Sequence, residues 1–231
     1  MHKRIGILGG MSPESTIEYY QHITHRYTER FGDYGYPEII IYSVSFQPYV
    51  DWPLNGEWDK VAAGLGTAAR KLQDAGADFI VISTNTMHMV VDEIRTYVDI
   101  PILSLLDVVA DAIQEKKLST VGLLGTAFTM GNRFYHDVLE ARGIEVITPD
   151  AQEQVYVNRV IYDELVAGKL LETSREGYLD IIHKLAERGA RGIILGCTEI
   201  PLLVKQADTP LPLLDTTILH AEAALAYALE P

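Results

Sequence analysis

Residues 76–86 read Gly76-Ala77-Asp78-Phe79-Ile80-Val81-Ile82-Ser83-Thr84-Asn85-Thr86, and a later part of the chain repeats this pattern. That second stretch reads Gly189-Ala190-Arg191-Gly192-Ile193-Ile194-Leu195-Gly196-Cys197-Thr198-Glu199. Each begins with Gly-Ala, continues into a short apolar run and ends in small polar residues. A short apolar run bounded by turn residues is typical of a buried strand. Thr84 and Cys197 occupy the same place in the two copies.

Two further patterns recur in the same order. Ile5-Gly6-Ile7-Leu8-Gly9-Gly10 is echoed by Val121-Gly122-Leu123-Leu124-Gly125-Thr126, and the strand led by Pro101 is echoed by the one led by Pro210. Apolar runs alternate with amphipathic stretches throughout, which indicates parallel sheets covered by helices on both faces. We therefore predict an α/β protein of two similar parallel-sheet domains related by pseudo-twofold symmetry. The first comprises residues 1–98 plus 210–231, and the second comprises residues 99–209.

The elements that this pattern predicts can be named by their residues. The strands are expected at 5–8, 39–42, 79–83, 102–105, 121–124, 146–148, 193–195 and 211–214, and helices at 15–27, 58–75, 132–141 and 178–188, among others. Parallel sheets bind ligands at the carboxyl ends of their strands. If the two units face each other, their equivalent strand ends line one cleft. We expect the active site there, with Thr84 and Cys197 on opposite sides of a ligand.

Composition excludes several classes of partner. The formal net charge of −13 disfavours nucleic acid and anionic membrane surfaces. The apolar runs are far shorter than the roughly 20 residues of a membrane span. Residues 1–10 do not resemble a signal peptide, and a single cysteine excludes an internal disulfide, so we expect a cytoplasmic protein.

Three motifs, taken together, resemble the aspartate/glutamate racemase superfamily. They are Gly-Ile-Leu-Gly-Gly-Met-Ser-Pro at 6–13, Thr-Asn-Thr-Met-His at 84–88 and Gly-Cys-Thr-Glu at 196–199. The resemblance covers almost the whole chain. In that family the second motif begins with cysteine, and the two cysteines lie on opposite faces of the substrate's α-carbon. This chain departs from the pattern, because Thr84 stands where the first cysteine is expected.

The resemblance implies a cofactor-independent amino-acid racemase in which Cys197 removes the α-proton of the L-enantiomer. Thr84, or a water that it holds, then transfers the proton on the other face of the α-carbon, although a hydroxyl is a far weaker base than a thiol. We expect the start of a helix after Cys197 to favour its thiolate. The plainer alternatives are that Cys197 is a small core residue and that Thr84 caps the next helix.

The substrate-binding candidates are polar groups or loops at predicted strand ends. The loop with Met11 and Ser12 precedes a helix whose N-terminus attracts a carboxylate, or is a plain tight turn. Some members of the family anchor the substrate with an arginine and a lysine, and the lysine position falls on Val166 here. Gln47 and Lys169 are the candidate substitutes, and a neutral pocket would broaden specificity. The full set is Met11, Ser12, Gln47, Asn85, Thr86, Thr126, Lys169 and Thr198.

We expect no cofactor and no metal, since the chain has neither a dinucleotide loop nor a metal-ligand spacing. His88 follows Thr84 by one helical turn and is interpreted as bonding a nearby acid or hydroxyl, or as structural. The family implies a homodimer. Two other functions stay open: a decarboxylase or isomerase of the same superfamily that uses the single cysteine, and a non-catalytic amino-acid-binding protein.

Overall fold

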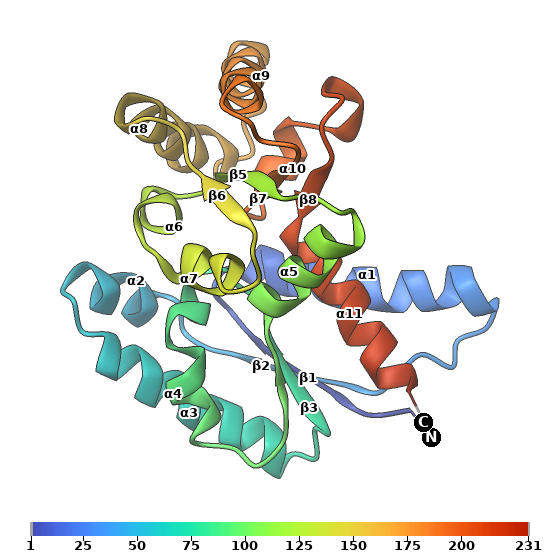
Figure 1. Ribbon diagram of the computed structural model, residues 1–231. Coiled ribbons are helices and arrows are strands. Elements are labelled where there is room, and N and C mark those ends of the chain that lie inside the picture. Colours follow the sequence, from blue (N-terminus) through green and yellow to red (C-terminus); the bar gives the residue numbers. More distant parts are fainter. Residues whose placement is uncertain (1, 231) are drawn as a thin grey trace. The chain divides into compact units, whose positions relative to one another are not determined.

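Two four-stranded parallel sheets form the framework of the computed structural model, which describes residues 2–230 (Figure 1). The first sheet has the order β2 (Ile39–Ser43), β1 (Ile5–Gly9), β3 (Phe79–Ile82) and β4 (Ile102–Leu103). The second has the same order of equivalent strands, β6 (Glu145–Ile147), β5 (Thr120–Leu124), β7 (Ile193–Leu195) and β8 (Leu213–Asp215). The predicted fold class is therefore confirmed.

The first unit runs to Val108 and resumes at Thr217. Alternate strand residues pack on opposite faces of its sheet, as the two-residue period of a strand requires. Leu8, Ile80 and Ile82 pack on one face against α3 (Trp58–Asp74) and α4 (Val91–Arg95). Residues of the other face contact α1 (Pro13–Phe31) and α11 (Thr216–Leu229), and Figure 1 shows these two pairs of helices on opposite sides of the strands. The unit also contains α2 (Gln47–Leu54) and the 3-10 helix η1 (Thr86–Val90).

The second unit spans Val109–Thr216. One face of its sheet, which includes Leu124, Ile193 and Leu195, packs against a cluster of helices. Those helices are α8 (Ala151–Val160), the single π-helical turn η2 (Ile161–Leu165), α9 (Glu172–Glu187) and α10 (Ile200–Leu203). The remaining elements are α5 (Leu105–Glu115), which begins in the first unit, α6 (Ala127–Gly131), α7 (Phe134–Glu140) and the 3-10 helix η3 (Gln206–Asp208).

The unit boundaries lie later in the chain than 98/99 and 209/210. β4 pairs with β3 and β8 pairs with β7, so each Pro-led strand completes the sheet that precedes it. The chain passes from one unit to the other only after these strands, within α5 and at the start of α11. Leu105 accordingly begins a helix, whereas the sequence pattern places it at the end of a strand.

The strand register supports the internal repeat. Leu8 lies opposite Ile82 in the first sheet, and Leu124 lies opposite Leu195 in the second. These are the residues that the repeat pairs with each other, so the two central strand pairs share one register. Thr84 and Cys197 each lie two residues beyond the registered position.

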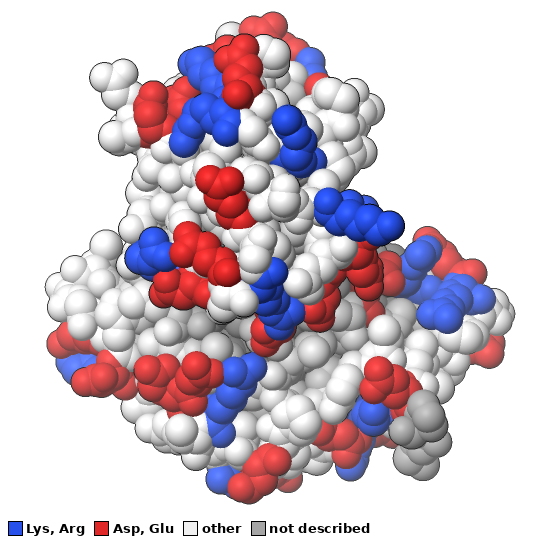
Figure 2. All heavy atoms as spheres, in the orientation of Figure 1, with Lys and Arg blue, Asp and Glu red and all other residues white. Residues whose placement is uncertain are grey.

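Acidic and basic side chains are interspersed over the face that Figure 2 shows. Among residues 2–230, no helix combines the length and the apolar character that a membrane crossing requires.

Candidate active site

In the first unit, the loop after β1 lies beside the segment after β2. Gly10 has a φ of +92°, and a Cβ atom there would lie 2.5 Å from the carbonyl oxygen of Val44. Only glycine fits this left-handed and crowded position without strain. The Val44 amide also donates to the carbonyl of Gly9 over 3.0 Å. The loop that carries Met11 and Ser12 is thus fixed at the carboxyl edge of the sheet.

Buried hydroxyl groups join this loop to the end of β3. Ser15 Oγ donates to the carbonyl of Ser83 over 2.8 Å. The Thr16 hydroxyl lies 3.2 Å from Ser83 Oγ and accepts the amide of Gly10 over 2.8 Å. Because Ser83 immediately precedes Thr84, the glycine loop and the Thr84 segment form one connected site.

Thr84 is partly buried at the end of β3, and its amide donates to the carbonyl of Ile82 over 2.9 Å. The residue at the N-cap of η1 is Asn85, which makes no side-chain capping bond, so Thr84 does not cap this helix. Asn85 is buried and Thr86 is partly buried. His88 bonds backbone groups, namely the carbonyl of Thr84 and the amide of Leu105, rather than an acid or a hydroxyl.

The other candidates of the first unit differ in what they offer a ligand. The Met11 side chain is buried in the hydrophobic core, which leaves only its backbone for binding. Ser12 is the N-cap of α1, as its sequence context indicates, and accepts the amide of Ser15 over 3.4 Å. Gln47 lies exposed at the first position of α2 and donates to Asp51 Oδ1 over 2.9 Å.

In the second unit, Cys197 lies partly buried just past β7, and its thiol donates to Glu199 Oε2 over 2.9 Å. The Thr198 hydroxyl donates to the same carboxylate oxygen over 2.8 Å. Burial raises the pKa of the Cys197 thiol well above its ordinary value, and the negative charge of Glu199 raises it further. The expectation that the helix start favours the thiolate is therefore wrong. The helix that follows, α10, has only four residues, and the neighbouring carboxylate opposes ionisation.

This pair has a clear chemical capacity. A thiol that is hydrogen-bonded to a carboxylate can pass its proton to that carboxylate and become a thiolate when a substrate arrives. A cysteine paired with a base in this way fits the general pattern of an activated nucleophile or proton acceptor.

Thr126 and Lys169 complete the candidates of the second unit. The loops that carry Thr126 and Cys197 are adjacent, since a Cβ atom at Gly125 would lie 3.3 Å from the carbonyl oxygen of Gly196. Thr126 is the N-cap of α6 and accepts the amide of Thr129 over 3.2 Å. Lys169 is exposed just past the turn that follows η2, and its amide donates to the carbonyl of Glu164 over 2.9 Å.

The sequence reasoning did not assign two residues that the structure places at this site. Glu199 stands in the Gly-Cys-Thr-Glu motif, and an acid two residues after the cysteine was a signal for it. Tyr162 lies on η2 and is 59% exposed; partial desolvation raises the pKa of its hydroxyl, and a negative charge on Cys197 or Glu199 raises it further. Tyr162 therefore lies within electrostatic reach of the thiol.

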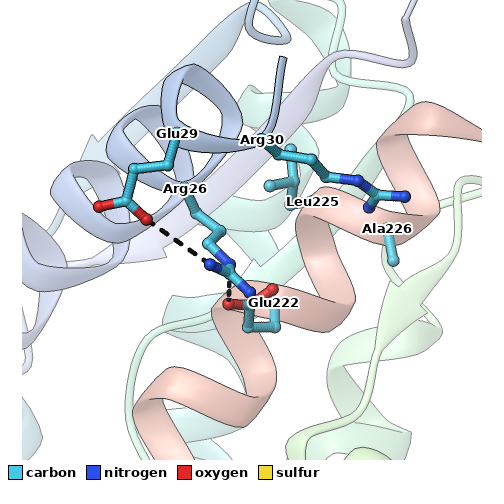
Figure 3. A pocket seen from close by; sticks show the side chains of 6 residues that line it. All are labelled: Arg26, Glu29, Arg30, Glu222, Leu225 and Ala226. Atoms are coloured by element: carbon cyan, nitrogen blue, oxygen red, sulfur yellow. Dashed lines mark ion pairs between the residues drawn. The ribbon is translucent and has the colours of Figure 1, made fainter. Parts of the chain in front are cut away.

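A surface recess elsewhere in the first unit is distinct from these groups. Figure 3 shows it between α1 and α11, where Arg26 pairs with Glu29 and with Glu222. Its volume is about 330 Å³. Arg26 follows Ser12 by about 20 Å along the axis of α1, at 1.5 Å per residue. The recess thus lies toward the opposite end of that helix from the glycine loop, and the ion pairs with Glu29 and Glu222 neutralise Arg26.

Comparison with known proteins places the chain in a family. The family model for Asp/Glu/Hydantoin racemase matches residues 8–224. A broad specificity amino-acid racemase, RacX from Bacillus subtilis, is 27% identical over 96% of this chain and 96% of its own. A candidate Asp/Glu racemase from Yersinia pestis is 45% identical, with a TM-score of 0.94 over 99% of this chain and 100% of that one. An aspartate racemase homologue from Pyrococcus horikoshii, PH1733, is 39% identical, with a TM-score of 0.90 over all of both chains. The chain is therefore an enzyme of the Asp/Glu/Hydantoin racemase family.

Proposed function

We propose that this enzyme racemises amino acids of the aspartate/glutamate type, and related ones, by a 1,1-proton shift at the α-carbon that needs no cofactor. Cys197 is the base that acts on the L-enantiomer. Thr84, or a water that it holds, supplies a proton to the opposite face. The observation that carries the proposal is the hydrogen bond from the Cys197 thiol to Glu199.

The first step begins from a protonated thiol. Glu199 accepts the thiol proton, which leaves a thiolate on Cys197 and a neutral carboxyl on Glu199. The thiolate then removes the α-proton, and the electron pair of the C–H bond moves into the substrate carboxylate. Hydrogen-bond donors around Asn85, Thr86 and Thr198 stabilise this charge, which is the main source of rate enhancement in such sites.

The second step needs a proton on the other face. The Thr84 hydroxyl, or its water, gives a proton to the α-carbon and recovers one from solvent. Because a hydroxyl is a much poorer base than a thiolate, the same group removes a proton from the D-enantiomer less readily. The two directions should therefore differ in kcat and in KM, while their kcat/KM values stay equal because enantiomers have equal free energy.

A broad substrate specificity is expected, because neither candidate residue for binding the substrate's side-chain carboxylate is well suited to it. Gln47 is neutral and bonded to Asp51, and Lys169 is exposed just past a surface turn. Neither supplies the planar, bidentate recognition of a carboxylate that arginine offers. The name of the Bacillus subtilis relative, a broad specificity racemase, is consistent with this interpretation.

Chiral chromatography of a panel of L-amino acids after incubation tests the proposal. The panel includes aspartate, glutamate and neutral and basic amino acids, and we expect the D-enantiomer of at least one to accumulate. Because Cys197 is the chain's only cysteine, iodoacetamide modifies one known thiol. Alkylation and the Cys197→Ala variant should each abolish turnover, with the fold checked by circular dichroism. Ordinary turnover by a folded Cys197→Ala protein would contradict the proposal.

A further inference from the structure

His88 is a buried side chain whose two ring nitrogens both bond backbone groups near Thr84. It is 2% exposed. The amide of Leu105, which can only donate, lies 3.1 Å from Nε2, so Nε2 is the unprotonated nitrogen. The proton is therefore on Nδ1, which donates to the carbonyl of Thr84 over 2.8 Å. The imidazole bridges the end of β3 and the start of α5.

This bridge has a fixed protonation state at neutral pH. Burial lowers the pKa of His88 to about 4. The groups that face it are the His220 ring, at a centroid distance of 5.8 Å, and the charges of Arg95 and Asp107. His220 is also buried, and its ring lies 2.8 Å from the Tyr19 hydroxyl and 3.0 Å from the carbonyl of Leu103.

The backbone around Thr84 is held at successive groups. The Thr84 amide bonds the carbonyl of Ile82, and Ser15 Oγ bonds the carbonyl of Ser83. His88 holds the next carbonyl, that of Thr84. Because these bonds fix the peptide units on both sides of the Thr84 α-carbon, they also fix the direction of its side chain.

We propose that His88 is a positioning residue for proton transfer at Thr84, acting through its hydrogen bond to the Thr84 carbonyl. The inference rests on the proposed function and deepens it. If His88 were purely structural, it would join η1 to α5. Loss of its bond to Leu105 would then affect proton transfer as much as loss of its bond to Thr84. The two bonds of the bridge can be broken separately.

Two substitutions make this separation. Asparagine places its amide nitrogen near the position of histidine Nδ1, so His88→Asn can keep the donation to Thr84. Glutamine places its amide near Nε2, so His88→Gln can keep the contact with Leu105 and lose the one with Thr84. Each variant is incubated with an L-amino acid in heavy water. The readout is the rate of inversion divided by the rate of α-deuterium wash-in to the remaining L-enantiomer.

Wash-in reports Cys197, whereas inversion also requires the opposite face. We expect His88→Gln to lower the inversion to wash-in ratio by about tenfold or more, since displacements of about 1 Å have effects of this size or larger. His88→Asn should keep the ratio within about threefold of wild type. An equal ratio in the two variants, or a larger loss in His88→Asn, would overturn the inference.

The control is His220→Gln, which alters a second buried histidine that makes no hydrogen bond to Thr84 among the bonds described. We expect a lower melting temperature and an unchanged ratio, and an equal fall in the ratio would show that general destabilisation is the cause. If His88→Gln does not fold, His88→Asn decides, since it keeps the bond to Thr84 and loses the one to Leu105. A ratio within about threefold of wild type supports the inference, and a larger fall overturns it. Failure of the proposed function is distinguishable, because the wild-type enzyme would then show neither wash-in nor inversion.

Discussion

Cys197 Sγ donates a hydrogen bond to Glu199 Oε2 over 2.9 Å, and the Thr198 hydroxyl shares the same oxygen. The resting thiol is therefore protonated and already in contact with an acceptor for its proton. Burial and the charge of Glu199 both raise the pKa of the thiol. The structure thus favours a neutral resting thiol over a standing thiolate, and in the proposed mechanism Glu199 takes the thiol proton when the substrate binds.

Glu199→Gln should separate the two effects of this carboxylate. Removal of the negative charge lowers the pKa of Cys197, so the midpoint of iodoacetamide alkylation against pH should move to lower pH. Racemisation should nevertheless fall, by about 10²- to 10⁴-fold in kcat/KM, because the proton acceptor is lost. The measurement is the pH profile of alkylation beside that of turnover.

The matched control for this change is Glu187→Gln. Glu187 is an exposed glutamate of the same unit that pairs with His183 at the end of α9. Neither profile should change in this variant. A Glu199→Gln enzyme that retains full turnover would show that Glu199 is not the proton acceptor.

Thr84→Cys should speed proton transfer on the face of the substrate's α-carbon opposite Cys197. The substitution supplies a group that reaches the anionic state near neutral pH, at nearly the same volume. We expect kcat for the D-enantiomer to rise by at least about tenfold and far more than kcat for the L-enantiomer, with the KM for D shifting to keep the kcat/KM values equal. Initial rates measured from each pure enantiomer check this.

Thr86→Ser is a comparison variant for Thr84→Cys, since it removes a methyl group from a neighbouring partly buried threonine and adds no thiol. It should not raise kcat for the D-enantiomer. If a folded Thr84→Cys enzyme turns over the D-enantiomer no faster than wild type, Thr84 is not the proton-transfer group opposite Cys197.

The buried histidines predict acid destabilisation. Burial lowers the pKa of His88 to about 4 and that of His220 to about 3, whereas an unfolded chain binds these protons near pH 6.5. The folded pKa values are the lower ones, so their contribution to stability is intact above pH 6.5 and is lost as the pH falls below it. Each should contribute a loss of about 2 kcal/mol between pH 7 and pH 5. Urea unfolding at these two pH values measures the total.

His88→Asn is the control for this pH dependence. The variant has one titrating histidine fewer, so its loss of stability between pH 7 and pH 5 should be smaller than that of wild type by about 2 kcal/mol. If the two proteins lose the same free energy of unfolding, His88 does not titrate as its burial implies.

Independence from cofactors is a separate prediction. The enzyme should keep its rate after dialysis against a chelator and treatment with carbonyl reagents, because the proposed steps use only Cys197, Glu199 and the Thr84 face. A rate that is lost and then restored by pyridoxal phosphate or by a metal ion would refute this.

The sequence predicted the parallel sheets and their repeat because periodic patterns carry that information. The strand at Ile193–Leu195 was predicted with its observed bounds. The unit boundaries were displaced, because a Pro-led strand resembles the start of a unit while its pairing partner is set by tertiary structure. Likewise, the protonation state of Cys197 depends on its burial and on the side-chain rotamer of Glu199, and the local sequence pattern specifies neither. One hydrogen bond of His88 joins it to Leu105, 17 positions along the chain, and no local sequence pattern indicates such a contact.

The most direct test of opposite-face proton transfer is the isotopic content of the first D-enantiomer that forms in heavy water. An L-amino acid with ordinary hydrogen at its α-carbon is converted to a few per cent, and both enantiomers are separated and analysed by mass spectrometry. Removal on one face by Cys197 and return on the other through Thr84 predict that nearly every D-molecule carries one α-deuterium. D-enantiomer that retains the original α-hydrogen would mean that a single group carries the proton across, which would contradict the account.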